Sequence, residues 1–211
     1  VDFLMKAAEE LSKGPQPKDG EDFPLVISRR AMEALAGHQK HSVWPSAVKW
    51  HCEWLSKGAQ KRFQENVKKG DFAANAAVAE AQHELLRQLE SLVKQNIAYS
   101  ALARSILFAS LQPWKDAEQW APAEELQQKL AQVLSLSERL PAEIDIANLW
   151  IERADRARQK MLQAGLAIPK QLDPLHRKAL ARLYELQAGL PETSSSLTAI
   201  RMPWQKVVAQ Y

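Results

Sequence analysis

The segment from His38 to Lys69 gathers residue types that could do chemistry. It holds three of the seven tryptophans, three of the five histidines and the only cysteine of this 211-residue chain. His38, His41, His51 and Cys52 offer four nitrogen and sulfur ligands of the kind that zinc binds. Consecutive helical residues point about 100° apart, so His51 and Cys52 are not placed to grip one ion. We therefore predict no metal site.

Acid–base and nucleophilic chemistry has less support. Glu80-x-x-His83 is the i,i+3 pair that di-iron helical bundles use twice, but it occurs once here. Cys52 stands beside basic Lys49 and His51, which could lower a thiol pKa, yet a helix cysteine packed against a core is the commoner case. The chain has no nucleophile elbow, no glycine-rich phosphate loop and no HExxH motif. We expect a protein that is not an enzyme and uses no cofactor.

The same segment is the most basic part of the chain. Seven lysine and arginine residues stand against two glutamates, a local charge of +5 compared with +3 for the whole chain. Lysines on phosphates beside an aromatic ring that stacks on a base are the elements of single-strand nucleic-acid binding. The residues predicted to contact a nucleic acid or another partner are Lys49, Lys57, Lys61, Arg62, Lys68 and Lys69.

The tryptophans have two competing interpretations. Trp50 and Trp54 are one turn apart on a predicted helix, which favours a packed apolar stripe. Tryptophan is also enriched among the residues that anchor protein interfaces, and several others lie at predicted turns and ends. Burial decides between the two, because a buried ring neither stacks on a base nor meets a partner. The candidate interface anchors are Trp44, Trp114, Trp120 and Trp204.

Composition bounds the class of protein. Hydrophobic residues make up 46% and charged residues 25% of the chain, as in an ordinary globular protein. The richest apolar run, 106–111, is far shorter than the roughly 20 residues that cross a membrane, so no membrane partner is expected. One cysteine cannot form an internal disulfide, which favours a reducing, cytoplasmic compartment.

Glycine and proline punctuation predicts an all-α fold. The glycines sit at helix ends or in loops and several prolines stand at helix starts, as expected. Helices are predicted over 122–140, 142–164 and 174–189. One long helix is predicted over about 72–112, with a bend near 96–100. Its apolar stripe repeats every seven residues: Val78, Leu85, Leu92, Tyr99 and Ile106.

Short connections favour antiparallel neighbours. The expected architecture is an antiparallel bundle over 71–189, a smaller N-terminal helical cap over 1–70 and a loosely ordered C-terminal tail over 190–211. The expected function is that of a non-enzymatic helical scaffold, adaptor or assembly subunit that binds protein partners. The alternative is a nucleic-acid-binding accessory protein that uses region 44–69. The seven-residue recurrence would serve packing within one chain or across a homo-oligomer.

Overall fold

A computed structural model describes residues 23–35, 42–70 and 74–211 of the chain. The predicted zinc-ligand candidates His38 and His41 lie outside these residues. The described residues contain helices and no strands, which confirms the all-α class. None of these helices is long and apolar enough to cross a membrane. The helices are α2 Phe23–Leu35, α3 Trp44–Lys68, α4 Ala74–Gln95, the 3₁₀ helix η2 Ile97–Tyr99, α5 Ser100–Ser110, α6 Gln112–Asp116, α7 Trp120–Val133, α8 Leu136–Gln163, α9 Pro174–Ala188 and α10 Ser196–Val208.

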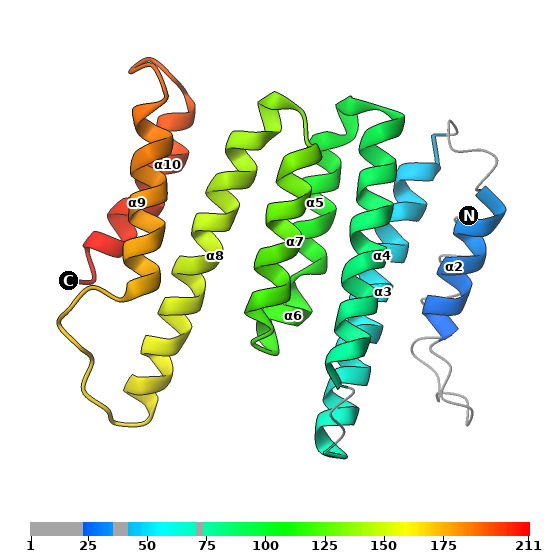
Figure 1. Cartoon of the computed structure of the whole chain (residues 1–211), viewed down its shortest axis with the longest axis horizontal. Helices are drawn as coiled ribbons and strands as arrows, with labels where there is room; N and C mark the ends of the chain where they lie inside the picture. The colour runs from blue at the N-terminus through cyan, green and yellow to red at the C-terminus, as the bar shows by residue number, and fades with distance from the viewer. Residues whose placement is uncertain (1–22, 36–41, 71–73) are drawn as a thin grey trace. The chain divides into compact units, whose positions relative to one another are not determined.

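The helices form two compact units, residues 1–135 and 136–211. The boundaries predicted at 70/71 and 189/190 do not coincide with this division. The first unit is built around α3, which packs against α2, α4, α5 and α6 (Figure 1). Helices α2 and α3 are therefore integral parts of the first unit, because α2 packs on α3 and α3 makes its most extensive contacts with α4.

The segment predicted as one long helix over 72–112 is broken at Asn96. α4 ends at Gln95, and Asn96 takes an extended conformation with φ −153° and ψ 117°. Its side-chain oxygen accepts a hydrogen bond from the backbone N–H of Ala98 at 3.0 Å. Asparagine competes for the backbone in this way, which favours a turn over a continuous helix. The chain then reverses, so that α5 packs against α4.

The longest described helix is α8, with 28 residues, and Pro141 lies inside it. The sequence placed a break between two helices at this proline, but the break falls at Leu134 and Ser135 instead. Leu134 is extended, with ψ 159°, and the backbone N–H of Ser135 donates to the hydroxyl oxygen of Ser100 at 3.0 Å. The Ser100 side chain, 35 positions away in the sequence, thus stabilises the connection between the end of α7 and the start of α8.

The second unit consists of α8, α9 and α10, with α10 packed against both of the others. The prediction of a loosely ordered tail over 190–211 is wrong, because residues 196–208 are helical. Leu197, Ile200 and Val207 are buried and provide the apolar contacts of α10. The polar run 193–196 suggested disorder, but Ser194 accepts a hydrogen bond from the backbone N–H of Ser196 at the start of the helix.

Candidate functional site

Three of the four candidate tryptophan anchors belong to the core of the first unit. Trp44, Trp114 and Trp120 are buried, and Trp114 is 0% exposed. An indole ring carries a large apolar area, so packing it inside the unit is strongly favourable. These three residues are therefore not exposed anchors, and Trp204 on α10, which is 43% exposed, is the one that remains.

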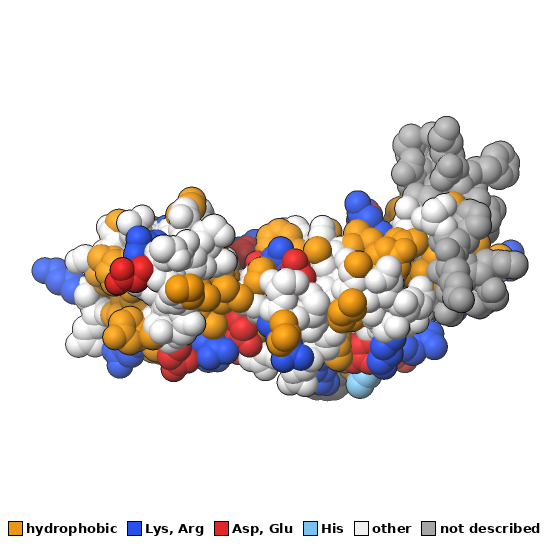
Figure 2. Space-filling view, turned by 90° about the horizontal axis from the view of Figure 1, so that it is seen from above, with side chains coloured by type: hydrophobic (Ala, Val, Ile, Leu, Met, Phe, Trp, Pro, Cys, Tyr) orange, Lys and Arg blue, Asp and Glu red, His pale blue; other side chains and the backbone are white. Residues whose placement is uncertain are grey.

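The predicted basic contact residues are exposed, but the aromatic rings beside them are not free to stack. The six lysine and arginine side chains predicted as contacts all lie on the solvent side of α3. Trp50 is buried, and the half-buried Trp54 has the Lys57 ammonium 4.8 Å from its ring centre. On the face shown in Figure 2, lysine and arginine side chains are dispersed among acidic and hydrophobic ones. The basic side chains predicted from sequence are exposed, but neither Trp50 nor Trp54 offers a fully exposed ring for a base to stack on.

A buried serine–histidine–glutamate arrangement lies between α2, α3 and α4. The Ser28 hydroxyl is 3.0 Å from Nδ1 of His51, and Nε2 of His51 is 3.9 Å from a carboxylate oxygen of Glu84. The Ser28 hydroxyl also lies 2.9 Å from the carbonyl oxygen of Leu25, a hydrogen-bond acceptor in its own helix. Ser28 is fully buried. This geometry suits a structural hydrogen bond, since a nucleophile must face its substrate.

Burial governs the ionisation of His51 and Cys52. Desolvation lowers the pKa of His51, and the charges of Arg29 and Arg87 lower it further against the opposing effect of Glu84. Desolvation also raises the pKa of the Cys52 thiol, which is buried and reduced. A protonated thiol in the core is a poor nucleophile. No group of three or more metal-ligating side chains occurs within the described ranges.

A cleft of about 520 Å³ opens beside His51. Arg29, Arg62 and Arg87 line it together with Glu33, Glu80 and Glu84. Arg87 forms two hydrogen bonds with Glu84, at 2.8 and 2.7 Å. Because the charges of the lining balance, the cleft has no net charge with which to select a ligand.

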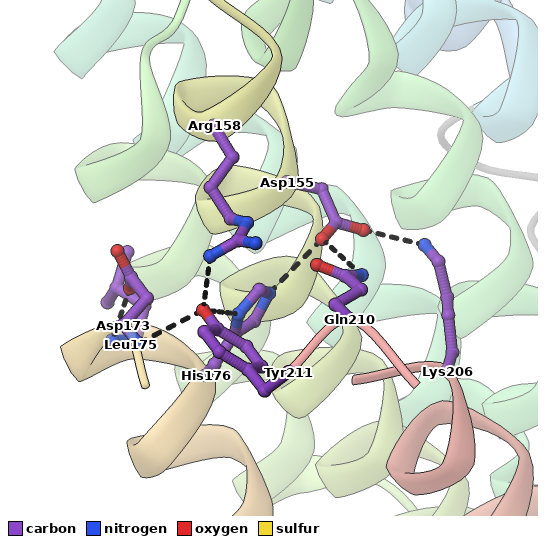
Figure 3. A network of polar contacts seen from close by, with 8 residues as sticks. All are labelled: Asp155, Arg158, Asp173, Leu175, His176, Lys206, Gln210 and Tyr211. Atoms are coloured by element: carbon purple, nitrogen blue, oxygen red, sulfur yellow. Dashed lines mark hydrogen bonds and ion pairs between the residues drawn. The ribbon is translucent and has the colours of Figure 1, made fainter. Parts of the chain in front are cut away.

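The second unit contains a polar network that the sequence did not predict (Figure 3). His176, fully buried on α9, lies 3.1 Å from Asp155 of α8 through Nε2 and 3.1 Å from the Tyr211 hydroxyl through Nδ1. The same hydroxyl accepts from Arg158 at 2.8 Å and from the backbone N–H of Asp173 at 3.1 Å. The hydrogen bonds of this network join residues that are 21 to 53 positions apart, so no local sequence pattern predicts it.

Asp155 connects the network to α10. One of its oxygens accepts from Lys206 at 2.7 Å and the other from Gln210 at 2.9 Å. Partial burial disfavours the Asp155 carboxylate, but these two hydrogen bonds and the charge of Lys206 outweigh that effect and lower its pKa. Asp155 is therefore held as a carboxylate that fixes the C-terminal part of α10 on α8.

The helix held in this way exposes apolar side chains. Four of the eleven large hydrophobic residues exposed in the described part of the chain occur within ten positions: Met202, Trp204, Val208 and Tyr211. Trp204 and Val208 are one helical turn apart and share a face. Met202 lines a groove of about 630 Å³ between α10 and α8, where Ile151 and Pro203 also lie.

Comparison with known proteins assigns no family to this chain. No family model, no curated protein and no solved structure matches it. Its function must be argued from the surfaces described above.

Proposed function

We propose that this chain is a non-enzymatic helical adaptor, or a subunit of a larger assembly, that binds a protein partner through α10 of its second unit. The observation that carries the proposal is the exposure of Met202, Trp204 and Val208 on a helix that is fixed in place. Cysteine usage further favours a cytoplasmic setting.

The chemistry of α10 indicates the kind of partner. Exposed aromatic and aliphatic side chains on one helix are typical of helices that insert into the apolar groove of another protein. α10 also carries Arg201 and Lys206 and no acidic residue. We therefore propose a partner groove that is apolar at its centre and acidic at its rim, since complementary charges speed association and fix orientation.

Rigidity supports the same assignment. Ordering a long side chain or a loose segment on binding costs about 0.5–1.5 kcal/mol for each side chain. The hydrogen bonds from Lys206 and Gln210 to Asp155 hold the helix before any partner arrives. A helix that is already ordered loses less entropy on binding.

Site-specific photo-crosslinking tests the proposal. A photoreactive phenylalanine analogue replaces Trp204 in one variant and Leu136 in another, and the full-length chain is irradiated in its native host. Leu136 is a matched control, because it is 80% exposed in the same unit but lies at the start of α8. We expect one discrete adduct from position 204, none from position 136, and loss of the adduct when Met202→Asp and Val208→Asp are added. Equal labelling from both positions, or none from 204, contradicts the proposal.

Nucleic-acid binding is the second candidate function, favoured by the exposure of the basic residues on α3. Lys57, Lys61, Arg62, Lys68 and Lys69 lie within 13 positions and are all exposed. The prediction is weak binding whose logarithm falls linearly with the logarithm of salt concentration. Charge reversal at these five positions should abolish binding to single- and double-stranded DNA, whereas reversal of Arg153 and Lys160 on α8 should not. Absence of binding at low salt excludes this function.

A further inference from the structure

The Tyr211 hydroxyl has its full complement of hydrogen bonds, and this determines the proton positions around it. It accepts from Arg158 and from the backbone N–H of Asp173, neither of which can accept in return. Its own proton is therefore directed to Nδ1 of His176, 3.1 Å away. Nδ1 must be the unprotonated nitrogen, and Nε2–H donates to Asp155 at 3.1 Å. The network is complete only with a neutral His176.

A proton added to His176 has to go on Nδ1, the nitrogen that faces Tyr211. The tyrosine oxygen already accepts two hydrogen bonds and would then face a third donor, while its own proton would lose its acceptor. The Arg158 guanidinium donates to the same hydroxyl at 2.8 Å, so two positively charged groups would then face one oxygen. Asp155 favours the charge, because its carboxylate contacts the opposite nitrogen of the ring.

These opposing effects act on different contacts. The hydrogen bonds that Asp155 accepts from His176, Lys206 and Gln210 remain possible when His176 is charged, because Asp155 is the acceptor in all three. The contact between His176 and Tyr211 is the one that the proton disrupts. Protonation should therefore release Tyr211 while the middle of α10 stays docked through Leu197, Ile200 and Val207.

We propose that His176 is a pH-sensitive latch that controls how firmly the C-terminal end of α10 is held, and with it the presentation of the partner-binding surface. Only the effect on partner binding rests on the proposed function. Tyr211 is itself one of the exposed large hydrophobic residues beside Val208, so its release alters part of the exposed apolar surface. Binding through α10 should then be weaker at acidic pH, because the partner must order residues that were held beforehand.

Amide NMR of the full-length chain tests the latch without any partner. The ¹H–¹⁵N signals of Asp173 and of residues 207–211 are followed from pH 8 to pH 5, the range in which histidine side chains change charge. We expect these signals to move together with one midpoint, because the Asp173 amide loses its bond to Tyr211 as the C-terminal turn loosens. In Tyr211→Phe the same signals should already resemble the acidic wild-type spectrum at pH 8.

His176→Gln is the companion variant, because its amide can donate to Asp155 but does not titrate. The signals of Asp173 and residues 207–211 should be insensitive to pH in this variant. The latch is excluded if the wild-type signals do not move between pH 8 and pH 5, or if His176→Gln retains the wild-type titration. If His176→Gln fails to fold, the comparison of wild type with Tyr211→Phe decides alone. The latch then requires the signals of Asp173 and residues 207–211 in Tyr211→Phe at pH 8 to match those of the wild type at acidic pH.

The two proposals fail in distinguishable ways. A crosslink from position 204 with no titration of the Asp173 amide leaves the adaptor function standing and removes the latch. A titrating network with no crosslink leaves the latch as a property of the second unit and removes the proposed function. If the crosslink from position 204 and the titration of the Asp173 amide are both observed, the crosslink yield should fall at acidic pH in the wild type and be unaffected by pH in His176→Gln.

Discussion

The hydroxyl of Ser28 lies 3.0 Å from Nδ1 of His51, and both side chains are buried where α2 packs on α3. The two residues are 23 positions apart in the sequence. The Ser28 hydroxyl also lies 2.9 Å from the Leu25 carbonyl oxygen, so it links His51 of α3 to the backbone of α2. This arrangement explains why two polar side chains are tolerated inside the first unit, and it leads to the first two predictions.

Ser28→Ala should destabilise the first unit. The substitution leaves Nδ1 of His51 buried without its hydrogen-bond partner, which costs about 1–3 kcal/mol. Urea unfolding followed by tryptophan fluorescence measures this loss, since most of the tryptophans lie in the first unit. Ser46→Ala, on an exposed position of the neighbouring helix α3, is the control and should change the free energy of unfolding by less than about 0.5 kcal/mol. Equal effects of the two substitutions would contradict the assigned hydrogen bond.

The first unit should lose stability as pH falls below about 6.5. Burial holds the pKa of His51 below its usual value of 6.5 in the folded state. Below pH 6.5 the unfolded chain therefore binds a proton that the folded chain refuses, and linkage makes the free energy of unfolding decrease with falling pH. A urea series from pH 8 to pH 5.5 measures the slope. His51→Gln should make the slope shallower, and an unchanged slope in this variant argues against His51 as its source.

Cys52 should be inert in the folded protein. The thiol is fully buried on α3, and burial raises its pKa, so little reactive thiolate is present at neutral pH. A chromogenic disulfide reagent should therefore label the native chain only at the rate of unfolding and should label it rapidly in urea. Ser46→Cys, which adds an exposed thiol to the same helix, should react at once under native conditions. Rapid labelling of wild type would show that Cys52 is accessible.

Truncation of two tryptophans should lower the folding free energy by very different amounts. Trp114→Ala removes a fully buried ring from the first unit and should cost about 3–5 kcal/mol of folding free energy. Trp204→Ala removes a ring that is 43% exposed and should cost far less, about 1 kcal/mol or below, while it should weaken binding of the proposed partner. Thermal unfolding compares the two variants directly. A larger loss of stability from Trp204→Ala would show that this ring supports the fold.

The sequence by itself determined the class of fold and several helix ends. Proline and glycine have strong local conformational preferences, so the start of α9 at Pro174 and its end near Gly189 were predictable. The charge of α3 was likewise a property of the sequence, and its lysines are exposed because no local interaction favours their burial.

Only the tertiary structure decided where the chain reverses and which side chains meet. The apolar stripe of 72–112 has the same period on both sides of Asn96, so periodicity could not distinguish one helix from an antiparallel pair. Burial of Trp44, Trp114 and Trp120 depends on which helices cover them. The convergence of Asp155 of α8, His176 of α9 and the C-terminal Tyr211 is set by packing, because hydrogen bonds between distant residues leave no local pattern in the sequence.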